Sequence, residues 1–436
     1  MLDLFTHILN IVYYGGNMKK LLILGSGTGG TIIANVMRKK LKNTEWDITI
    51  IDKSLDHLYQ PGLLFLPFVL YGYNDETAVR KDKKKFIPAG VNFVEAEINL
   101  IDHAKKSVKT TNGNFDYDKL VVALGCDVHP EEVEGMEKAI GSGVNTFYSL
   151  PSAMQLQKDL SKFEGGRLIL NIAEMPIKCP VAPLEFVFLA DYYFTKKGIR
   201  DKVEIALCTP TPGAFSKPIA SGILGASMEK KNIKVIPNFT IASVDNKKKT
   251  MTSYEKHEEN YDLLVSIPPT RGADLVDDSG IGNGAGYVNV DHHTLKVNHV
   301  EDIFAVGDVC NVPTSKAGSV THFMAEVVIE NLLRDINGES AKPDFDGHSN
   351  CFIESGFKKA YLIDFNYKVE PLPGNFPIPG FGPFGLLKDT KINHMGKMAF
   401  KPLYWSKLLR GKPLAPFNMV SNKLRLAGKD TSLLKS

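Results

Sequence analysis

The stretch KKLLILGSGTGG, residues 19–30, decides the fold of the first part of the chain. Lys19 to Leu24 is a short apolar run that predicts a strand. Gly25, Gly27 and Gly30 follow it in the pattern G-x-G-x-x-G. In this position the glycines allow a tight turn and the close approach of a pyrophosphate to a helix N-terminus, where unpaired N–H groups and the helix dipole favour an anion.

The residues after the glycines complete a strand–helix–strand unit. A helix is expected from Thr31 to about Leu41, followed by a strand from Asp47 to Ile51 that ends at Asp52. Asp52 stands 22 residues after Gly30, where a carboxylate can accept a hydrogen bond from a ribose hydroxyl. The ordered set predicts a dinucleotide site, and the alternative is a glycine-rich turn that holds no ligand.

Length, charge and cysteine content narrow the class of protein. The 436 residues suggest two or three domains, and a net charge of +3 argues against a dedicated nucleic-acid binder. The cysteines show no CxxC pair and no zinc-ligand spacing, so no metal site is predicted. The five positions are Cys126, Cys179, Cys208, Cys310 and Cys351.

A second α/β region is expected from about Gly166 to Pro269, with apolar strands near 167–171, 202–208, 233–238 and 262–268. A nicotinamide cofactor would need another glycine-rich turn after the first of these strands. The chain instead reads NIAEMPIKCPVAPLEF over residues 171–186. A lone cysteine, Cys179, thus stands in a loop bracketed by prolines where a second nucleotide would bind.

Three further segments complete the coarse organisation. Asn112-Gly113 predicts a hairpin, and DIFAVGDV at 302–309 precedes an amphipathic helix. From about Asp346 the chain is rich in Pro, Gly, Phe and Lys. Residues 1–17 fit a signal peptide poorly, so Met18 is expected to be the start, and no run of 18 apolar residues predicts a spanning helix.

GSGTGG, YDKLVVALG (117–125) and FAVGDV (304–309) together resemble the two-dinucleotide-binding-domain flavoproteins of the disulfide-reductase type. The resemblance implies that FAD lies on the first motif and that the strand ending at Ala123 and Gly125 closes the FAD domain. It also implies that Gly307 and Asp308 lie near the ribityl and phosphate region of FAD.

Within that superfamily, the chain is similar to the sulfide:quinone oxidoreductases. The similarity rests on IKCPVAPLEF around Cys179, NCFIESG around Cys351, and the tail segments EPLPGNFPIPGFGPF and NHMGKMAF. It implies that Cys179 and Cys351 meet near the flavin and cycle through disulfide and persulfide forms. Some members carry a third cysteine that can bond to the flavin, but the corresponding region here, NTFYSLPSAMQ, has none, so FAD is expected to be non-covalent.

The resemblance also implies the remaining parts of the chemistry. Sulfide would attack the Cys179–Cys351 disulfide, and Glu185, six residues after Cys179, is expected either to manage protons or to act only as a first-turn acid favoured by the helix dipole. Cys208 and Cys310 are expected to be buried thiols.

A membrane quinone would need aromatic walls and one or two hydrogen-bond donors. Lys316 and Lys397 are the candidate donors, and the candidate walls are Phe352, Phe381, Phe384 and Phe400. Residues 402–412, PLYWSKLLRGK, suit an interfacial helix with aromatics at the lipid headgroups, or else a helix packed on its own domain. Peripheral, monotopic association with a membrane surface is therefore expected, on a face that is not assigned.

The predicted fold is α/β, with two Rossmann-like domains, one binding FAD and one a degenerate nicotinamide-type domain, and a C-terminal quinone- and membrane-contacting region. The expected parts are 18–150 and 271–345 for FAD, 151–270 for the second domain, and 346–436 for the C-terminal region. The alternatives are a sulfide dehydrogenase subunit donating to a cytochrome, a type II NADH:quinone oxidoreductase, and a flavin-binding redox sensor without turnover. A homo-oligomer is possible and is left open.

Overall fold

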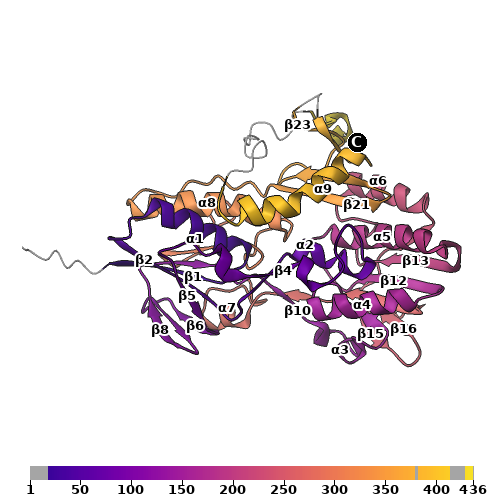
Figure 1. Ribbon diagram of the computed structural model, residues 1–436, viewed down its shortest axis with the longest axis horizontal. Coiled ribbons are helices and arrows are strands. Elements are labelled where there is room, and N and C mark those ends of the chain that lie inside the picture. The colour runs from indigo at the N-terminus through magenta and orange to yellow at the C-terminus, as the bar shows by residue number, and fades with distance from the viewer. Residues whose placement is uncertain (1–17, 379–381, 413–427, 436) are drawn as a thin grey trace, which may run out of the picture.

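The computed structural model of the protein describes residues 18–378, 382–412 and 428–435 (Figure 1). The expectation that translation starts at Met18 concerns residues 1–17, which lie outside the described residues, as does Phe381. Within the described ranges, no helix is both long and apolar enough to cross a membrane.

A five-stranded parallel sheet forms the first α/β unit. In spatial order its strands are β20 (Ile303–Ala305), β9 (Lys119–Val122), β1 (Lys19–Leu24), β2 (Trp46–Asp52) and β5 (Asn92–Glu95). Leu21 to Leu24 are buried, as expected for a central parallel strand covered on both faces. Helix α1 (Thr28–Lys40) follows β1 and packs against α8 (Gly318–Ile336).

Helix α1 begins at Thr28, three residues earlier than the sequence predicted. Its first turn therefore contains Gly29 and Gly30. A Cβ atom on Gly29 would lie 2.9 Å from a side-chain carbon of Val306, next to β20. The helix can start early because glycine lets its first turn lie directly against the neighbouring chain.

A second five-stranded parallel sheet forms the other α/β unit, and its strand positions confirm the α/β class predicted from the sequence. In order the strands are β11 (Val144–Asn145), β18 (Leu263–Ile267), β12 (Gly166–Ile172), β13 (Val203–Cys208) and β14 (Ile233–Ile236). Its helices are α4 (Leu150–Lys162), α5 (Ala182–Lys197) and α6 (Pro218–Glu229). α5 is buried along most of its length because α5 contacts both β12 and β21.

Smaller elements join and flank the two units. An antiparallel meander accompanies each sheet, and the Asn112-Gly113 hairpin lies in the first of them, as predicted. The elements are β3 (Asp56–Leu58), β4 (Arg80–Asp82), β6 (Ile98–Asp102), β7 (Ser107–Thr110), β8 (Gly113–Asp116), β10 (Asp127–Val128), β15 (Ile241–Asp245), β16 (Thr250–Ser253), β17 (Glu258–Asn260), β19 (Thr270–Arg271), α2 (Gln60–Leu63), α3 (Met136–Ala139) and α7 (Asp274–Asp278).

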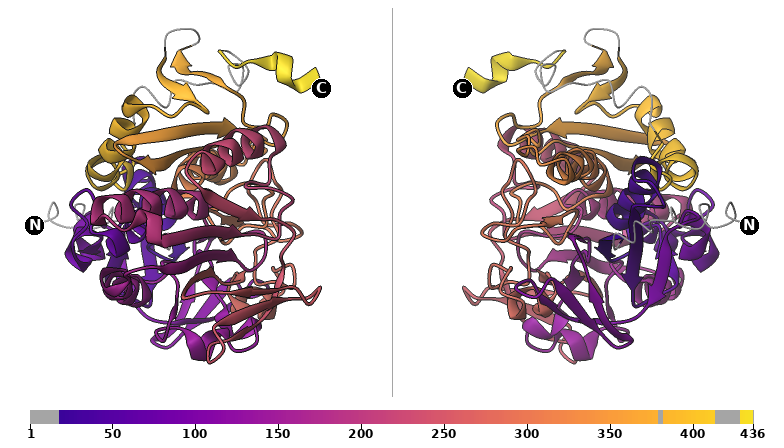
Figure 2. Two further views of the ribbon diagram at one scale, coloured as in Figure 1. Left: turned by 90° about the vertical axis from the view of Figure 1, so that its right-hand side faces the viewer. Right: turned by 90° about the vertical axis from the view of Figure 1, so that its left-hand side faces the viewer.

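The C-terminal region forms a third layer that lies along the top of both units in Figure 1, and Figure 2 shows the same layer from two sides. Its sheet has the order β21 (Ser349–Gly356), β22 (Lys359–Phe365), β24 (Gly382–Leu386), β23 (Gly374–Ile378). Helix α9 (Lys391–Leu403) packs on this sheet, and β21 contacts α5 and α8. The third layer thus brings residues near 351 and 397 against both α/β units.

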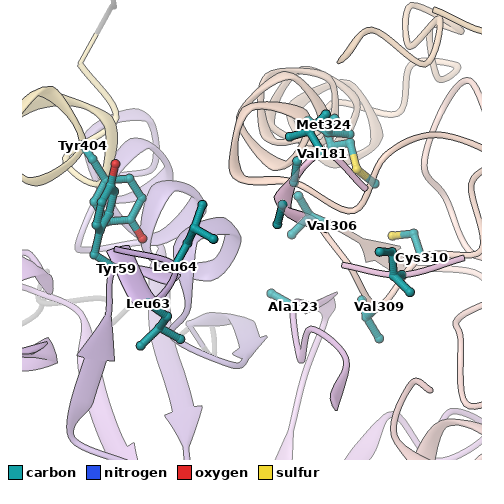
Figure 3. Close-up of a cluster of buried hydrophobic side chains, with 14 of the residues drawn as sticks. Tyr59, Leu63, Leu64, Ala123, Val181, Val306, Val309, Cys310, Met324 and Tyr404 are labelled. Atoms are coloured by element: carbon teal, nitrogen blue, oxygen red, sulfur yellow. The ribbon is translucent and has the colours of Figure 1, made fainter. Parts of the chain in front are cut away.

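The chain after α9 is buried in the first unit. Tyr404 is 3% exposed, and its hydroxyl lies 2.6 Å from His57 Nε2 and 2.8 Å from Thr28 Oγ1. Its ring lies beside that of Tyr59, with centroids 5.0 Å apart (Figure 3). Trp405 is 7% exposed and stacks on Phe86 at 5.1 Å.

The interfacial role predicted for residues 402–412 is therefore wrong for their aromatic side chains. Tyr404 and Trp405 are enclosed by protein, as are Leu408 and Leu409. The reason is that the first unit offers the Tyr404 hydroxyl two hydrogen-bond partners and offers the Trp405 ring an aromatic stack. The alternative prediction, a helix packed on its own domain, is therefore correct for the side chains of Tyr404, Trp405, Leu408 and Leu409.

Trp405→Ala is expected to destabilise the protein by about 3 kcal/mol or more, because a buried aromatic side chain would be replaced by a cavity. Met395→Ala, on the exposed face of α9, serves as the control, since Met395 is 66% exposed. We would compare the two by urea unfolding of the purified protein. Equal midpoints for both variants would show that Trp405 does not hold the C-terminal layer.

Candidate active site

The turn between β1 and α1 forms one side of a cradle of about 440 Å³. A Cβ atom on Gly25, whose φ is +94°, would lie 2.4 Å from the carbonyl oxygen of Ala123, and one on Gly30 would lie 1.9 Å from the carbonyl oxygen of Gly25. Gly27 has no atom within 4 Å of the corresponding point. Gly25 and Gly30 are thus fixed by packing, whereas Gly27 borders open space that a pyrophosphate could occupy.

The structure brings most of the predicted cofactor residues to this cradle. Gly30 does not line it but lies behind the turn. The predicted residues that line it are Gly25, Gly27, Asp52, Ala123, Gly125, Gly307 and Asp308. They come from the carboxyl ends of β1, β2, β9 and β20, which meet at one edge of the parallel sheet, the usual ligand site of such folds. The cradle therefore fits a dinucleotide.

Asp52 is held as a charged acceptor at the end of β2. Its Oδ2 accepts hydrogen bonds from Ser26 N at 2.6 Å and Ser26 Oγ at 2.9 Å, and it lies 2.7 Å from Lys83 Nζ. Burial raises the pKa of Asp52, but the Lys83 cation and the Ser26 hydrogen bonds lower it more, so the net shift is downward. An ionised carboxylate here suits a ribose hydroxyl. Sequence reasoning missed Lys83, since a lysine in a KKK run resembles an ordinary surface residue.

The loop between β12 and α5 positions Cys179. The residue has a φ of +45°, a left-handed conformation that is uncommon outside glycine and is often found at functional sites. Its backbone N–H donates to the carbonyl of Lys316 at 2.6 Å. The preceding residue, Lys178, is also fixed, since its ammonium donates to the carbonyl of Cys126 at 2.7 Å and its carbonyl accepts from Tyr148. The loop is therefore tied to both α/β units.

Cys351 lies on β21, and it lines the same cavity as Cys179. This cavity measures about 130 Å³ and its walls are mostly apolar. The third layer thus brings together two cysteines that are far apart in the sequence. The wall residues include Tyr59, Val181, Phe323, Phe352, Phe376, Phe400, Leu403 and Leu408.

Of the candidate quinone residues, Phe352, Phe400 and Lys397 line the cysteine cavity. Phe384 packs edge-on against Phe352, with ring centroids 5.6 Å apart. Lys316 is not brought to this cavity. Its ammonium donates to the carbonyls of Asp308 at 2.7 Å and Cys310 at 2.9 Å.

The side chain of Lys316 borders a separate pocket of about 630 Å³. Pro176 and Pro180 of the cysteine loop line the same pocket, together with the charged residues Glu174 and Arg271. The cysteine loop therefore has an apolar cavity lined by its cysteine and a more polar pocket lined by its prolines.

Glu185 and Lys397 form a buried ion pair next to the cysteines. Glu185, in the first turn of α5, is 1% exposed, and its Oε1 accepts from Lys397 Nζ at 2.7 Å and from the backbone N–H of Glu354 at 2.8 Å. Burial raises the pKa of Glu185, and the opposing effect of Lys397 does not cancel it. Burial lowers the pKa of Lys397, but the Glu185 carboxylate and Cys179 raise it more. The pair therefore holds protons strongly.

The pKa values of the Cys179 and Cys351 thiols are both raised. Burial raises the pKa of Cys351 to about 11, with Lys397 opposing the shift. Burial, and next to it the negative charge that Cys351 can carry, raises the pKa of Cys179 further. Cys208 and Cys310 are fully buried, in accord with their expected role, and neither lines the cysteine cavity.

A second buried acid adjoins this pair and was missed by sequence reasoning. Glu354, three residues after Cys351, has no exposed surface. Its carboxylate accepts from Tyr71 OH at 2.9 Å and lies 2.9 Å from His394 Nδ1. His394 and Lys397 are one helical turn apart on α9, which indicates two basic side chains on one face of that helix but does not identify Glu354 on β21.

Comparisons with known proteins show which family the chain belongs to. The sequence profile of the family described as pyridine nucleotide-disulphide oxidoreductase matches residues 19–162 and 190–325, and the interval between them contains Cys179. The mitochondrial sulfide:quinone oxidoreductase of Dictyostelium discoideum is 28% identical over 406 residues, covering 91% of this chain and 87% of that protein. A type II NADH:quinone oxidoreductase of Staphylococcus aureus is 25% identical over 359 residues, covering 74% and 84%.

Among solved structures, the sulfide:quinone oxidoreductase of Aquifex aeolicus has a TM-score of 0.76 at 21% identity, covering 92% of this chain and 94% of that chain. This likeness confirms the fold of two Rossmann-like domains with an added C-terminal layer. The family and the dinucleotide cradle together imply a flavin cofactor. With its profile matching well over half of the residues, this chain belongs to the pyridine nucleotide-disulphide oxidoreductase family.

Proposed function

We propose that the protein is an FAD-dependent sulfide:quinone oxidoreductase that takes two electrons from sulfide and delivers them to a membrane quinone. The observation that carries the proposal is the shared apolar cavity, which contains Cys179 from the second unit, Cys351 from the third layer, and the ammonium-bearing Lys397. The named relatives of Dictyostelium and Aquifex support the same assignment.

The cysteine cavity adjoins the flavin cradle. Residues 58–61 border both, since Leu58 and Gln60 line the cradle while Tyr59 and Pro61 line the cavity. When bound, the flavin would accept the two electrons from the sulfur site and release them to a second substrate. The arrangement therefore places a sulfur site and an electron acceptor on either side of one short segment.

The sulfur step uses the two cysteines as a disulfide. HS⁻ attacks one sulfur, the Cys179–Cys351 bond breaks, a persulfide forms on the attacked cysteine, and the other leaves as a thiolate. Raised pKa values favour protonation of that leaving thiolate, and the Lys397–Glu185 pair, whose charges act on both thiols, can supply the proton. This supports the proton-handling role of Glu185 over a role limited to the helix dipole.

The apolar cavity suits a quinone. Phe352 and Phe400 supply aromatic walls, and Lys397 supplies a charged donor for one carbonyl oxygen. Because Lys316 borders a different pocket, whereas Lys397 lines the cysteine cavity, we keep the donor role for Lys397 alone.

A type II NADH:quinone oxidoreductase is not favoured, because the glycine-rich turn that it needs after β12 is replaced by the Cys179 loop. A cytochrome-reducing sulfide dehydrogenase subunit would share the cysteine pair, and quinone turnover separates the two. A non-turnover redox sensor would show no steady-state activity. We also propose that FAD is non-covalent, since no cysteine lies among the residues that line the cradle.

We propose further that α9 contacts a membrane surface. Ile392 is 48% and Met395 66% exposed, and Ala399 and Pro402 continue the same stripe. The opposite side of the helix contributes Lys397 and Phe400 to the cavity. A helix with its outer face in lipid would therefore place the cavity at the depth from which a quinone enters.

The decisive experiment mixes the flavin-loaded protein anaerobically with sulfide and then with a short-chain quinone. We expect sulfide, but not NADH, to bleach the flavin absorbance, and quinone to restore it. Cys179→Ala and Cys351→Ala should keep the flavin but lose bleaching by sulfide. Cys208→Ala, which removes a buried thiol outside the cavity, is the matched control. Bleaching by NADH and not by sulfide would overturn the proposal.

The reduced thiols should alkylate slowly at neutral pH. Because burial raises both pKa values, the reactive thiolate fraction should keep rising with pH across about pH 6 to 10, rather than levelling off near the pKa of an ordinary cysteine. Lys397→Met removes a cation that lowers both values, so it should slow alkylation at every pH. Lys391→Met, at the exposed start of α9, is the control. Faster alkylation in Lys397→Met would contradict this electrostatic account.

Membrane contact can be tested by sedimentation with lipid vesicles. Met395→Glu is expected to weaken binding, because it places a charge in the apolar stripe of α9. Tyr254→Glu is the matched control, since Tyr254 is also 66% exposed but lies in the second unit, between β16 and β17. Equal binding by both variants would remove α9 from the contact surface.

A further inference from the structure

An open pocket of about 880 Å³ lies at the surface of the first unit, beside the chain that follows α9. Strand β4 and the residues after it form one wall, and residues 405–412 contribute to the other. Five basic and three acidic side chains line this pocket. The basic ones, all of them exposed, are Arg80, Lys81, Lys85, Arg410 and Lys412.

The acidic side chains of the pocket already have partners. Arg80 lies 2.8 Å from Asp56 and 3.4 Å from Glu76, and Asp82 accepts from the backbone N–H of Lys84 at 2.8 Å. Within the described part of the chain, the other four cations of the pocket form no ion pair. The pocket therefore presents positive charge that no carboxylate neutralises.

Stacked aromatic rings hold two of these cations in place. The Lys81 ammonium lies 4.6 Å from the centroid of the Trp405 ring, and the Arg410 guanidinium lies 5.7 Å from that of Phe86. Trp405 and Phe86 stack on each other with centroids 5.1 Å apart. A cation on an aromatic face keeps its charge, so the stack positions the two side chains without neutralising them.

The pocket begins where the apolar stripe of α9 ends. Ser406 lines the pocket, and its hydroxyl donates to the carbonyl of Pro402, the last member of that stripe, at 2.7 Å. Burial, followed by the nearby charge of Lys81, lowers the pKa of Lys401 on α9. Cations gathered at the end of an apolar surface suit a phosphate group at the boundary of a bilayer.

We propose that this pocket binds the phosphate group of an anionic phospholipid and makes the membrane contact of the protein selective for negatively charged bilayers. This selectivity depends on the contact proposed above for α9. An apolar helix face alone would bind neutral and anionic bilayers alike, whereas each cation near the surface adds attraction to an anionic one. The planar guanidinium of Arg410 can bind two phosphate oxygens at once, while Lys81 acts as a point charge.

General attraction between a basic protein and an anionic surface is the competing explanation. The chain carries a net charge of +3, and under that explanation any exposed lysine would contribute equally. A local site depends instead on Lys81 and Arg410. Lys234 and Lys247, which are exposed in the second unit, provide a matched pair of cations outside the pocket.

The test measures sedimentation of the full-length, flavin-loaded protein with vesicles of phosphatidylcholine, or of phosphatidylcholine and phosphatidylglycerol in equal parts. We expect the wild-type protein to bind the mixed vesicles about tenfold or more tightly at low salt, with a smaller preference at high salt. Lys81→Gln with Arg410→Gln should lose most of this preference and keep the affinity for phosphatidylcholine. Lys234→Gln with Lys247→Gln, which changes the net charge equally, is the matched control.

Three results would overturn the proposal. The first is equal affinity of the wild-type protein for both kinds of vesicle, and the second is an equal loss of preference in the two double variants. The third is loss of the preference when inorganic phosphate is added at constant ionic strength, which would identify a free anion as the ligand. If Lys81→Gln with Arg410→Gln lowers the melting temperature, Lys85→Gln with Lys412→Gln replaces it, and an unchanged preference there would also overturn the proposal.

Failure of the α9 contact would look different. Met395→Glu should weaken binding to both kinds of vesicle, because the apolar stripe serves neutral and anionic bilayers alike. An unchanged affinity in Met395→Glu would count against α9, whereas loss of the anionic preference alone would count against the pocket. Bleaching of the flavin by sulfide is independent of both results and continues to test the enzymatic function.

Discussion

The site depends on one buried ion pair, Lys397 with Glu185, which joins the third layer to the second α/β unit. Two ionised side chains are costly to bury, and they are kept only where each satisfies the other. Here Glu185 also accepts a hydrogen bond from the backbone N–H of Glu354, and Lys397 donates one to the carbonyl of Phe352. α5, β21 and α9 are thereby locked in one arrangement, and this arrangement places both cysteines on a single cavity. The raised pKa values of Glu185 and Lys397 also keep a proton donor beside the cysteines, where thiolates form.

The parts of the fold that follow from local pattern were predictable from the sequence. The G-x-G-x-x-G turn, the buried apolar strands and the Asn-Gly hairpin each depend on residues within a few positions of one another. The shared cavity of Cys179 and Cys351 was anticipated only through the resemblance to known enzymes. No spacing in this chain would have shown that two cysteines so far apart meet.

The remaining features depend on long-range packing. The ammonium of Lys316 donates to the carbonyls of Asp308 and Cys310. The positions of these carbonyls depend on the path of the loop after β20, which local sequence does not predict. Tyr404 and Trp405 alternate with cations in a way that suits a lipid interface, yet the first unit supplies partners that bury them. Lys83 and Glu354 look like surface charges in sequence, and only the fold shows that each is enclosed by protein.

The hydroxyl of Tyr404 has a consequence for the order of assembly. It binds Thr28 and His57, and both of these residues line the dinucleotide cradle, whereas Tyr404 comes 376 residues after Thr28. The hydrogen bonds that hold the Thr28 and His57 side chains beside the cofactor site can thus form only after residue 404 has been synthesised. Cofactor capture should therefore be a post-translational event that also fastens the C-terminal segment, so that loading with flavin and docking of this segment favour each other.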